Sequence, residues 1–419
     1  MTSSSTDHGV AVGAGDGADC STDRQHRQRA IGFLNGAHAL DHFVILIYPT
    51  VVIELATVYG RSYSELIALG SASFTAFGLF SLPAGWLADR WSRRNMMVAF
   101  YLGSGLSLVA AAFSPSLTVL AAALFALGVF GAIYHPVGTA LLLENATQRG
   151  RTLAFNAVCG NPGVALAAGI TAALTATLSW RGAFLLPGIV CIAGGLAYVR
   201  FVGNDARRAV ARDVSPEVAM SRPLAVTIFT LFVVVALTGG LVVNTITLAL
   251  PKIIDERSGL SLVMVGGLTT AVVLFGALAQ LAVGRMAEQM RPHVLFALVA
   301  AMQLAGIVWV TYATGTALFV ALAFTVGATL SQITVNDLVI ARYTADAWRG
   351  RVYAVRYALT FMVSGISASM IAVMHGRGGF DLVLEALVAI AVAFLAAVLA
   401  IALVAHGVDK GRAPQLVPA

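Results

Sequence analysis

Three ionisable residues fall within five positions of one apolar segment, where they could carry protons or bind a metal ion. The segment is 30–57, and the residues are His38, Asp41 and His42. On a helix, His38 lies on the same side as Asp41 and His42, because residues three and four apart are neighbours. Histidine exchanges protons near neutral pH, and imidazole and carboxylate groups bind divalent transition metals. The spacing therefore predicts one reactive face that looks into a polar cavity.

A second apolar segment, 117–144, adds Tyr134 and His135, followed by Pro136. An ionisable side chain at mid-bilayer costs about 2.5–3.5 kcal/mol, so such groups usually mark a functional pathway. The alternative for His135 is a static hydrogen bond to a backbone carbonyl that Pro136 leaves open. The candidate proton carriers, and in the alternative reading the candidate metal ligands, are His38, Asp41, His42 and His135.

The elements that must position these groups are membrane-spanning helices. Hydrophobic residues make up 58% of the 419 residues, and charged residues only 11%, whereas soluble proteins carry about 25% charged residues. Apolar runs of about 20 residues match a bilayer core, and in lipid such runs must be helices to satisfy their backbone. We predict twelve spans, at 30–57, 64–88, 95–113, 117–144, 152–177, 182–202, 223–250, 261–284, 293–313, 316–343, 352–375 and 382–405.

Polar segments divide the chain. Residues 1–28 are too polar to bury a core and are predicted to be a disordered N-terminus; no apolar core of a cleavable signal peptide precedes the first span. Two six-helix bundles are expected at 29–202 and 223–405, joined by a linker at 203–222 and followed by a tail at 406–419.

The distribution of Lys and Arg predicts the orientation. If both termini are cytoplasmic, only five of the 26 basic residues face the other side, namely Arg61, Arg181, Lys252, Arg257 and Arg377. We therefore expect a multi-pass protein of the inner (plasma) membrane with both termini in the cytoplasm. The net charge of +6 is then explained by contact with anionic lipid, without a nucleic-acid partner.

The two halves repeat two short motifs. Arg149-Gly150-Arg151 recurs 200 residues later as Arg349-Gly350-Arg351, and Gly85-Trp-Leu-Ala-Asp89 recurs 199 residues later as Gly284-Arg-Met-Ala-Glu288. A shared offset predicts an internal duplication of six helices, with a substrate site between the halves near the midplane.

The loop after the second span reads Gly85-Trp-Leu87-Ala88-Asp89-Arg90-Trp-Ser92-Arg93-Arg94. It resembles the helix 2–3 loop of major facilitator superfamily transporters, Gly-x-Leu-Ala-Asp-Arg-x-Gly-Arg-Arg/Lys, and departs from it only at Ser92. The resemblance implies an all-α membrane transporter, with twelve helices in two pseudo-symmetric six-helix bundles around a central cavity. It also implies a monomer that is not an enzyme and needs no cofactor.

The resemblance further implies that helices 1, 4, 7 and 10 line the cavity. Spans 7 and 10 would then contribute Asn244, Gln332, Asn336 and Asp337. The alternative for Asp337 is a static salt bridge with Arg342 or Arg356.

The charged loop residues are expected to form a conformational latch. Asp89 would accept hydrogen bonds from a neighbouring helix N-terminus, and Arg93 or Arg94 would pair with Glu144. In the alternative reading, these charges only anchor the loops. The predicted latch residues are Gly85, Asp89, Arg90, Arg93, Arg94 and Glu144.

Three places resemble the fosmidomycin-resistance-type efflux branch of the superfamily. They are His38 followed by an acid and then Tyr48-Pro49, Tyr134-His135-Pro136 (Phe-His-Pro in the branch), and Gly160-Asn161-Pro162-Gly163 (Gly-Gly-Asn-x-Gly in the branch). Asp41 and His42 stand where the branch has Asn and Asp. The last motif also predicts a bend of helix 5 at Pro162.

These features favour a secondary transporter that exports a small organic molecule by proton-coupled antiport through alternating access. No nucleotide-binding loop is present in the sequence, which fits transport driven by a gradient. The alternative is a carrier of a transition metal or metal chelate, which could be an importer and would use the His/Asp cluster. The cysteines Cys20, Cys159 and Cys191 show no paired spacing, which argues against disulfides and a zinc site.

Overall fold

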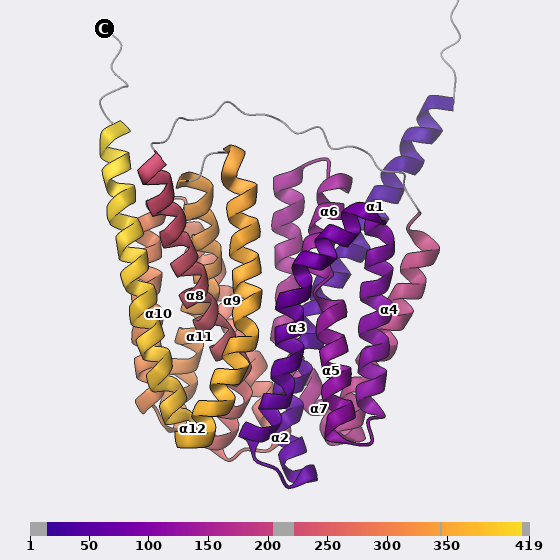
Figure 1. The fold of residues 1–419 in the computed structure, drawn as a ribbon, viewed down its shortest axis with the longest axis vertical. Coiled ribbons are helices and arrows are strands. Elements are labelled where there is room, and N and C mark those ends of the chain that lie inside the picture. Colours follow the sequence, from indigo (N-terminus) through magenta and orange to yellow (C-terminus); the bar gives the residue numbers. More distant parts are fainter. Residues whose placement is uncertain (1–14, 204–221, 344–345, 413–419) are drawn as a thin grey trace, which may run out of the picture.

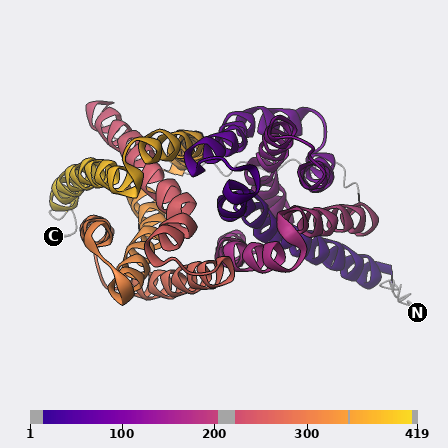
Figure 2. The same cartoon turned by 90° about the horizontal axis from the view of Figure 1, so that it is seen from below.

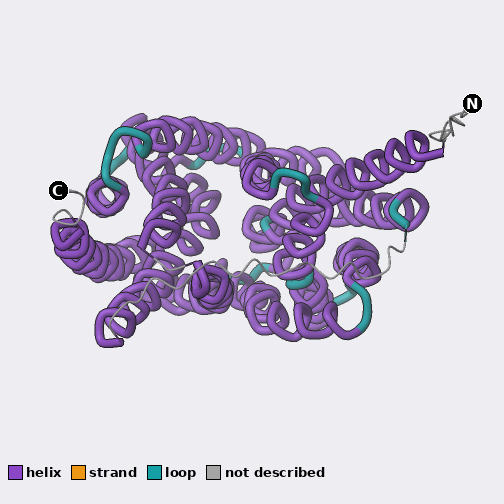
Figure 3. The backbone as a smooth tube through the Cα atoms, turned by 90° about the horizontal axis from the view of Figure 1, so that it is seen from above, coloured by secondary structure: helices purple, strands orange, loops and turns teal. Residues whose placement is uncertain are grey.

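The computed structural model describes residues 15–203, 222–343 and 346–412 (Figure 1). Within these ranges the chain is helical, with short connecting loops and no strand (Figure 3). The elements are α1 (Gly15–Ile45), α2 (Ile47–Tyr59), α3 (Tyr63–Arg90), α4 (Arg93–Ala112), α5 (Leu117–Gly131), the π-helical turn η1 (Tyr134–Gly138), α6 (Thr139–Asn145), α7 (Arg149–Phe201), α8 (Arg222–Ser258), α9 (Leu262–Met286), α10 (Pro292–Tyr312), α11 (Gly315–Tyr343) and α12 (Asp346–Arg412).

Ten helices in the described ranges are long and apolar enough to cross a membrane. Two of them, Gly150–Phe201 in α7 and Ala358–Gly407 in α12, contain 52 and 50 residues. A straight helix of that length would measure about 75 Å, whereas a bilayer core is about 30 Å thick. Each must therefore change direction to remain in contact with lipid.

Both long helices do contain a break. In α7, Ser179 has φ 77° and ψ 168°; in α12, Gly379 has φ 63° and ψ −160°. The two arms of α12 meet at the lower end of the molecule in Figure 1. The breaks fall between the predicted spans 152–177 and 182–202, and between 352–375 and 382–405.

The first predicted span, 30–57, consists of two helices. Leu46 separates α1 from α2 with φ −95° and ψ 2°, and its N–H bonds to the carbonyl of Phe43 at 3.2 Å. The cause lies in the sequence: Pro49 has no N–H to offer the carbonyl of Ile45, so the regular ladder cannot continue there.

The predicted span 117–144 is also interrupted, because α5, η1 and α6 share it. The π-helical turn begins at Tyr134 and contains Pro136, which removes one backbone donor. Such turns within helices frequently occur at functional sites.

The helices form two groups, α1–α7 and α8–α12 (Figure 2). They meet where α3 packs on α12, α7 on α9, and α2 on α8. On α3 and α12, Gly78 lies against the backbone of Phe361 and Met362, and Gly365 lies against Thr75. Small residues permit this close approach of helices in lipid.

The two groups also touch at the lower end of Figure 1. The start of α1 and the end of α12 lie at the opposite, upper end. Tyr63 stacks edge-on against His375 with ring centroids 4.9 Å apart. The Nε2 atom of His375 lies 2.9 Å from Glu256 Oε1, and its Nδ1 atom lies 3.4 Å from Ser64 Oγ. These contacts join α3 to α8 and α12 at that end.

The predicted N-terminal segment 1–28 overlaps α1, which begins at Gly15. α12 likewise continues to Arg412, into the predicted tail 406–419. A helix extends as far as its backbone hydrogen bonds continue, whereas amino-acid composition identifies only the apolar part of that helix. Residues 1–14, 413–419 and most of the predicted linker (204–221) lie outside the described residues.

Candidate functional site

His38 of α1 is held by a backbone contact from α7. Its Nδ1 atom lies 2.7 Å from the carbonyl oxygen of Asn156, and the side chain is 9% exposed. Because a carbonyl oxygen can only accept, Nδ1 must carry the hydrogen, and in the neutral ring the Nε2 lone pair is free to accept. The Nε2 atom of His42 lies 3.2 Å from it, so His42 can donate to His38.

Asp41 lies deeper than its neighbours. Its side chain is 1% exposed, and Oδ2 lies 3.3 Å from His135 Nε2. This separation suits an ion pair, but the direction does not make a hydrogen bond, and neither carboxylate oxygen has a hydrogen-bond partner among the described residues. A buried carboxylate without such partners is costly, so the arrangement favours binding of a proton or a cation.

His135 connects this cluster to the second group of helices. It lies on η1 with 18% of its side chain exposed, and its ring lies 4.5 Å from that of Phe361 on α12. Its partner here is Asp41 rather than the backbone carbonyl of the alternative reading. The π-helical turn therefore places an imidazole between a buried acid and the facing half of the protein.

Tyr134 and Asn156 contact His38 and each other, and so help to fix the position of the cluster. The Tyr134 ring stacks on His38, with centroids 5.0 Å apart and planes 22° apart, and its hydroxyl donates to the Leu34 carbonyl at 3.0 Å. The amide of Asn156 donates to the Tyr134 hydroxyl at 3.0 Å and to Asn35 Oδ1 at 2.9 Å. Neither Asn156 nor Asn35 was predicted from the sequence. The signal that could have indicated Asn156 is its position as a single asparagine in an apolar run, one turn before Gly160.

The glycines of the predicted helix-5 bend pack on α1. Gly160 lies against the His38 ring and Gly163 against the backbone of Ala39. Asn161 is half-buried, and Pro162 is exposed inside α7. The close approach of α7 to α1 is therefore an additional role for these glycines, and the bend remains a prediction.

The polar residues of spans 7 and 10 lie on α8 and α11, in the second group of helices. Asn244 donates to the carbonyls of Gly240 at 2.8 Å and Thr360 at 3.2 Å. Gln332 of α11 packs against Gly239 of α8. Asn336, also on α11, is buried.

Asp337 forms an ion pair with Arg356, one of the two partners of the static alternative. The structure thus brings the candidate residues of spans 1 and 4 into one cluster. The His135 ring of this cluster contacts Phe361 of the second group.

The predicted latch residues make contacts within the first group. Arg93 pairs with Asp89 at 2.6 Å and with Glu144. Arg94 instead donates to the carbonyls of Val199 at 2.9 Å and Val202 at 3.1 Å, at the C-terminal end of α7. Arg93, not Arg94, is therefore the partner of Glu144.

The two remaining latch residues lie beside this ion-pair network. The Arg90 guanidinium lies over the Trp86 ring, 4.1 Å from its centroid. A Cβ atom on Gly85 would lie 3.4 Å from Pro136 Cβ, which places the last turns of α3, rather than a loop, beside η1.

One nitrogen atom each from His38, His42 and His135 lies within 4.8 Å of the other two. Three imidazoles beside a carboxylate are suitable ligands for a divalent transition metal. The Nδ1–H of His38 bonds to a backbone carbonyl, as metal-binding histidines commonly do. The geometry is thus compatible with proton exchange and with metal binding. Cys159 and Cys191 are free thiols.

Comparison with known proteins gives a family and a fold. The model of the Major Facilitator Superfamily matches residues 31–368. A protein described as a probable L-galactonate transporter of Escherichia coli is 29% identical over 135 residues, covering 32% of this chain and 30% of that protein. The 4-hydroxybenzoate transporter PcaK of Pseudomonas aeruginosa is 28% identical over 161 residues, covering 38% and 36%. The matches span about a third of each relative.

Two solved structures share the fold over most of their length. A bacterial homologue of the human lysosomal transporter Spinster, in an inward-facing and occupied conformation, has a TM-score of 0.71 at 12% identity, covering 90% of this chain and 94% of that chain. A D-xylose-proton symporter has a TM-score of 0.71 at 14% identity, covering 88% and 96%. At these identities the likeness concerns the fold alone.

Proposed function

Because the chain belongs to the Major Facilitator Superfamily, we propose that it is a secondary transporter that exports a small organic molecule in exchange for protons, and not an enzyme. The observation that carries the proton coupling is the pair Asp41–His135. Its acid is buried and has no hydrogen-bond partner in the described part of the chain, and its imidazole touches the facing group of helices.

The proposed cycle is alternating access. The ten apolar helices include two, α7 and α12, that each contain a break, and this supports the proposed arrangement of twelve spans in two six-helix bundles around a central cavity. The described contacts of Tyr63, Ser64 and His375 close the end opposite the termini. With both termini cytoplasmic in the inner membrane, the end that these contacts close faces away from the cytoplasm. The protein acts as a monomer in contact with lipid, and needs no cofactor or nucleic acid.

The likeness to fosmidomycin-resistance-type efflux proteins supports export. The relatives named above carry organic acids by name, and one structural neighbour is named as a proton symporter. These names favour a small organic solute and proton coupling. In symport the solute moves in the same direction as the proton, and in antiport it moves in the opposite direction. The direction of solute flux relative to the pH gradient therefore distinguishes the two.

The test is flux into proteoliposomes under an imposed pH gradient. Purified protein is reconstituted, and a panel of labelled organic solutes is followed with the gradient in either sense and after its collapse by a protonophore. Uptake that follows the gradient with antiport sign supports the proposal. Flux that is indifferent to the gradient contradicts proton coupling.

A second candidate, a carrier of a transition metal or metal chelate, is favoured by the three histidine nitrogens within 4.8 Å. In this case, the liposomes would accumulate zinc, cobalt or iron. Titration of the purified protein with cobalt would give an absorption band that His38→Ala and His135→Ala both remove. Absence of metal flux would leave the organic solute as the cargo.

A further inference from the structure

A second group of titratable side chains, here called the His375 cluster, joins the two groups of helices near the break of α12, at the lower end of Figure 1. Its members are Tyr63, Ser64, Lys252, Asp255, Glu256 and His375. The Nε2 atom of His375 lies 2.9 Å from Glu256 Oε1 on α8, and Nδ1 lies 3.4 Å from Ser64 Oγ on α3. The His375 and Tyr63 ring centroids are 4.9 Å apart. One imidazole therefore contacts an acid of its own group and two side chains of the other group.

The charges of this cluster balance when His375 carries a proton. Lys252 is shared between two acids, because its Nζ atom lies 2.6 Å from Asp255 Oδ2 and 3.5 Å from Glu256 Oε1. The side chains of Lys252 and Glu256 are only 13% and 34% exposed, so water compensates their charges in part. His375 is the other basic group paired with Glu256. Its protonated form therefore supplies the second positive charge that two carboxylates require.

Other charges on the same elements are paired among themselves or exposed. Arg257 of α8 pairs with Asp381 of α12 at 3.0 Å, and Arg61 pairs with Glu65 of α3 at 3.5 Å. Arg377 of α12 is exposed, where water and salt screen its charge. These groups therefore leave the charge balance of the His375 cluster unchanged.

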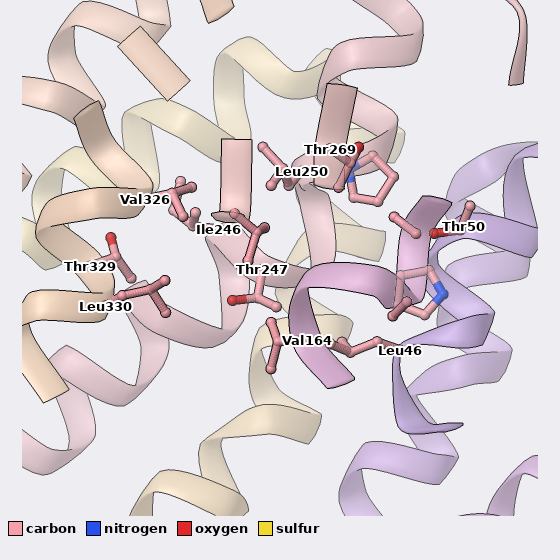
Figure 4. Close-up of a pocket in the computed structure, with 15 residues that line it drawn as sticks. Leu46, Thr50, Val164, Ile246, Thr247, Leu250, Thr269, Val326, Thr329 and Leu330 are labelled. Atoms are coloured by element: carbon pink, nitrogen blue, oxygen red, sulfur yellow. The ribbon is translucent and has the colours of Figure 1, made fainter. Parts of the chain in front are cut away.

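An apolar region separates the His375 cluster from the histidines of the candidate site. It contains the small cavity of Figure 4, which encloses about 30 Å³ and has no ionisable side chain in its lining. The lining includes Leu46, one turn after His42, and Pro251, which directly precedes Lys252. Both chain segments run downward in Figure 1, so His42 lies above the cavity and Lys252 below it. The His375 cluster can therefore bind a proton independently of the candidate site.

Protonation should strengthen the contacts between the two groups of helices. A protonated imidazole donates from both ring nitrogen atoms, so His375 then donates to Glu256 and Ser64 at the same time. A charged donor makes the stronger hydrogen bond, and a cation is attracted to the face of an aromatic ring such as that of Tyr63. Separating the groups would remove Ser64 and Tyr63 from His375 and expose Glu256 to water. Closure therefore favours the protonated form, and protonation favours closure by the same factor.

We propose that His375 and Glu256 form a second proton-binding site, which faces the side of the membrane opposite the termini and closes that end of the protein when it is protonated. This inference rests on the proposed transport function for its place in the cycle. A proton bound there after the solute has left would favour closure of that end, which is the step by which an antiporter returns to face the cytoplasm.

The experiment measures closure in the purified full chain, without solute or gradient. The natural cysteines are replaced by serine, and spin labels are attached to Thr177→Cys on α7 and Ser261→Cys beside α9, two exposed positions on different groups of helices. The distances between the labels, measured by double electron–electron resonance, give the ratio of closed to open molecules. We expect this ratio to rise about threefold to tenfold as the pH falls from about 8 to about 5.5, the range over which histidine commonly titrates.

Three variants of the labelled protein locate the proton. His375→Gln keeps a hydrogen-bonding side chain but cannot titrate, so its ratio should not vary with pH. Glu256→Gln removes the negative charge beside the imidazole, so the rise should move to lower pH. His406→Gln changes an exposed histidine of the same helix and should leave the rise unchanged. Melting temperatures verify that each variant is folded.

The two proposals fail in different ways. An equal rise in the folded His375→Gln protein, or no rise in the labelled parent protein, overturns this inference, whatever the flux assay gives. A rise that Asp41→Asn removes and His375→Gln retains assigns the pH response to the candidate site and also overturns it. Closure that depends on His375, together with flux that ignores the pH gradient, supports the second proton site and contradicts proton-coupled transport.

Discussion

The imidazole ring of His38 on α1 lies directly against Gly160 on α7. A Cβ atom on Gly160 would lie 2.8 Å from both Cε1 and Nε2 of that ring. One turn later, a Cβ atom on Gly163 would meet the carbonyl of Ala39. This close approach of the two helices brings the Asn156 carbonyl within 2.7 Å of His38 Nδ1. The position of His38 thus depends on a residue that has no side chain.

Gly160→Ala should therefore impair transport without unfolding the protein. The added methyl group displaces the His38 ring from the Asn156 carbonyl and from His42, and we expect a loss of initial flux of about tenfold or more. Flux in proteoliposomes and the melting temperature in detergent measure the two effects. Gly36→Ala is the control, because Gly36 is exposed on α1 and a Cβ atom there has no neighbour within 4 Å. Equal flux in the two variants would show that the contact does not position His38.

Asp41→Asn should abolish the response to a pH gradient while the protein level stays unchanged. The amide has nearly the shape of the carboxylate but cannot carry a proton at this depth. His135 would keep its place on η1 but lose the carboxylate beside it. Flux measured between about pH 5.5 and 8, the range over which histidine commonly titrates, should vary in the natural chain and be flat in the variant. Unchanged flux with unchanged pH dependence would remove Asp41 from the mechanism.

Much of this architecture can be predicted from composition and spacing, because a bilayer imposes long apolar runs. The face shared by His38, Asp41 and His42 follows from helical spacing, and its meeting with His135 from the fold that the loop motif implies. Asn156 could not be selected, since its role lies in a backbone carbonyl and in partners 22 and 121 positions away. The helix from Gly15 was missed because apolar runs do not reveal a polar helix.

The position of Arg93 and Arg94 within the loop motif also could not indicate which of the two pairs with Glu144. Both are basic and adjacent, but a helix turns by about 100° per residue, so the two side chains point in different directions. Arg93 faces Asp89 and Glu144, whereas Arg94 faces the carbonyls that end α7. Their roles follow from which helix each one meets.

This difference gives a prediction for the two arginines. Arg93→Ala and Glu144→Gln should have non-additive effects on stability, with a coupling free energy of at most about 1 kcal/mol, because the Arg93 side chain is 32% exposed and the Glu144 side chain 24%. Arg94→Ala combined with Glu144→Gln should be additive. Thermal or denaturant unfolding of the single and double variants measures both cycles. A larger coupling for Arg94 than for Arg93 would contradict the pairing in this state.

The contact between Ser64 and Gly376 gives a test of alternating access. A Cβ atom on Gly376 would lie 3.3 Å from Ser64 Cβ, so cysteines at both positions should form a disulfide in the state described here. The natural cysteines would first be replaced by serine. We expect the oxidised double variant to lose transport, and a reducing agent to restore it, because the cross-link joins α3 to α12 and prevents the two groups from separating at that end. Either cysteine alone, treated with the same oxidant, is the control. Full flux in a quantitatively cross-linked protein would show that this end does not open during the cycle.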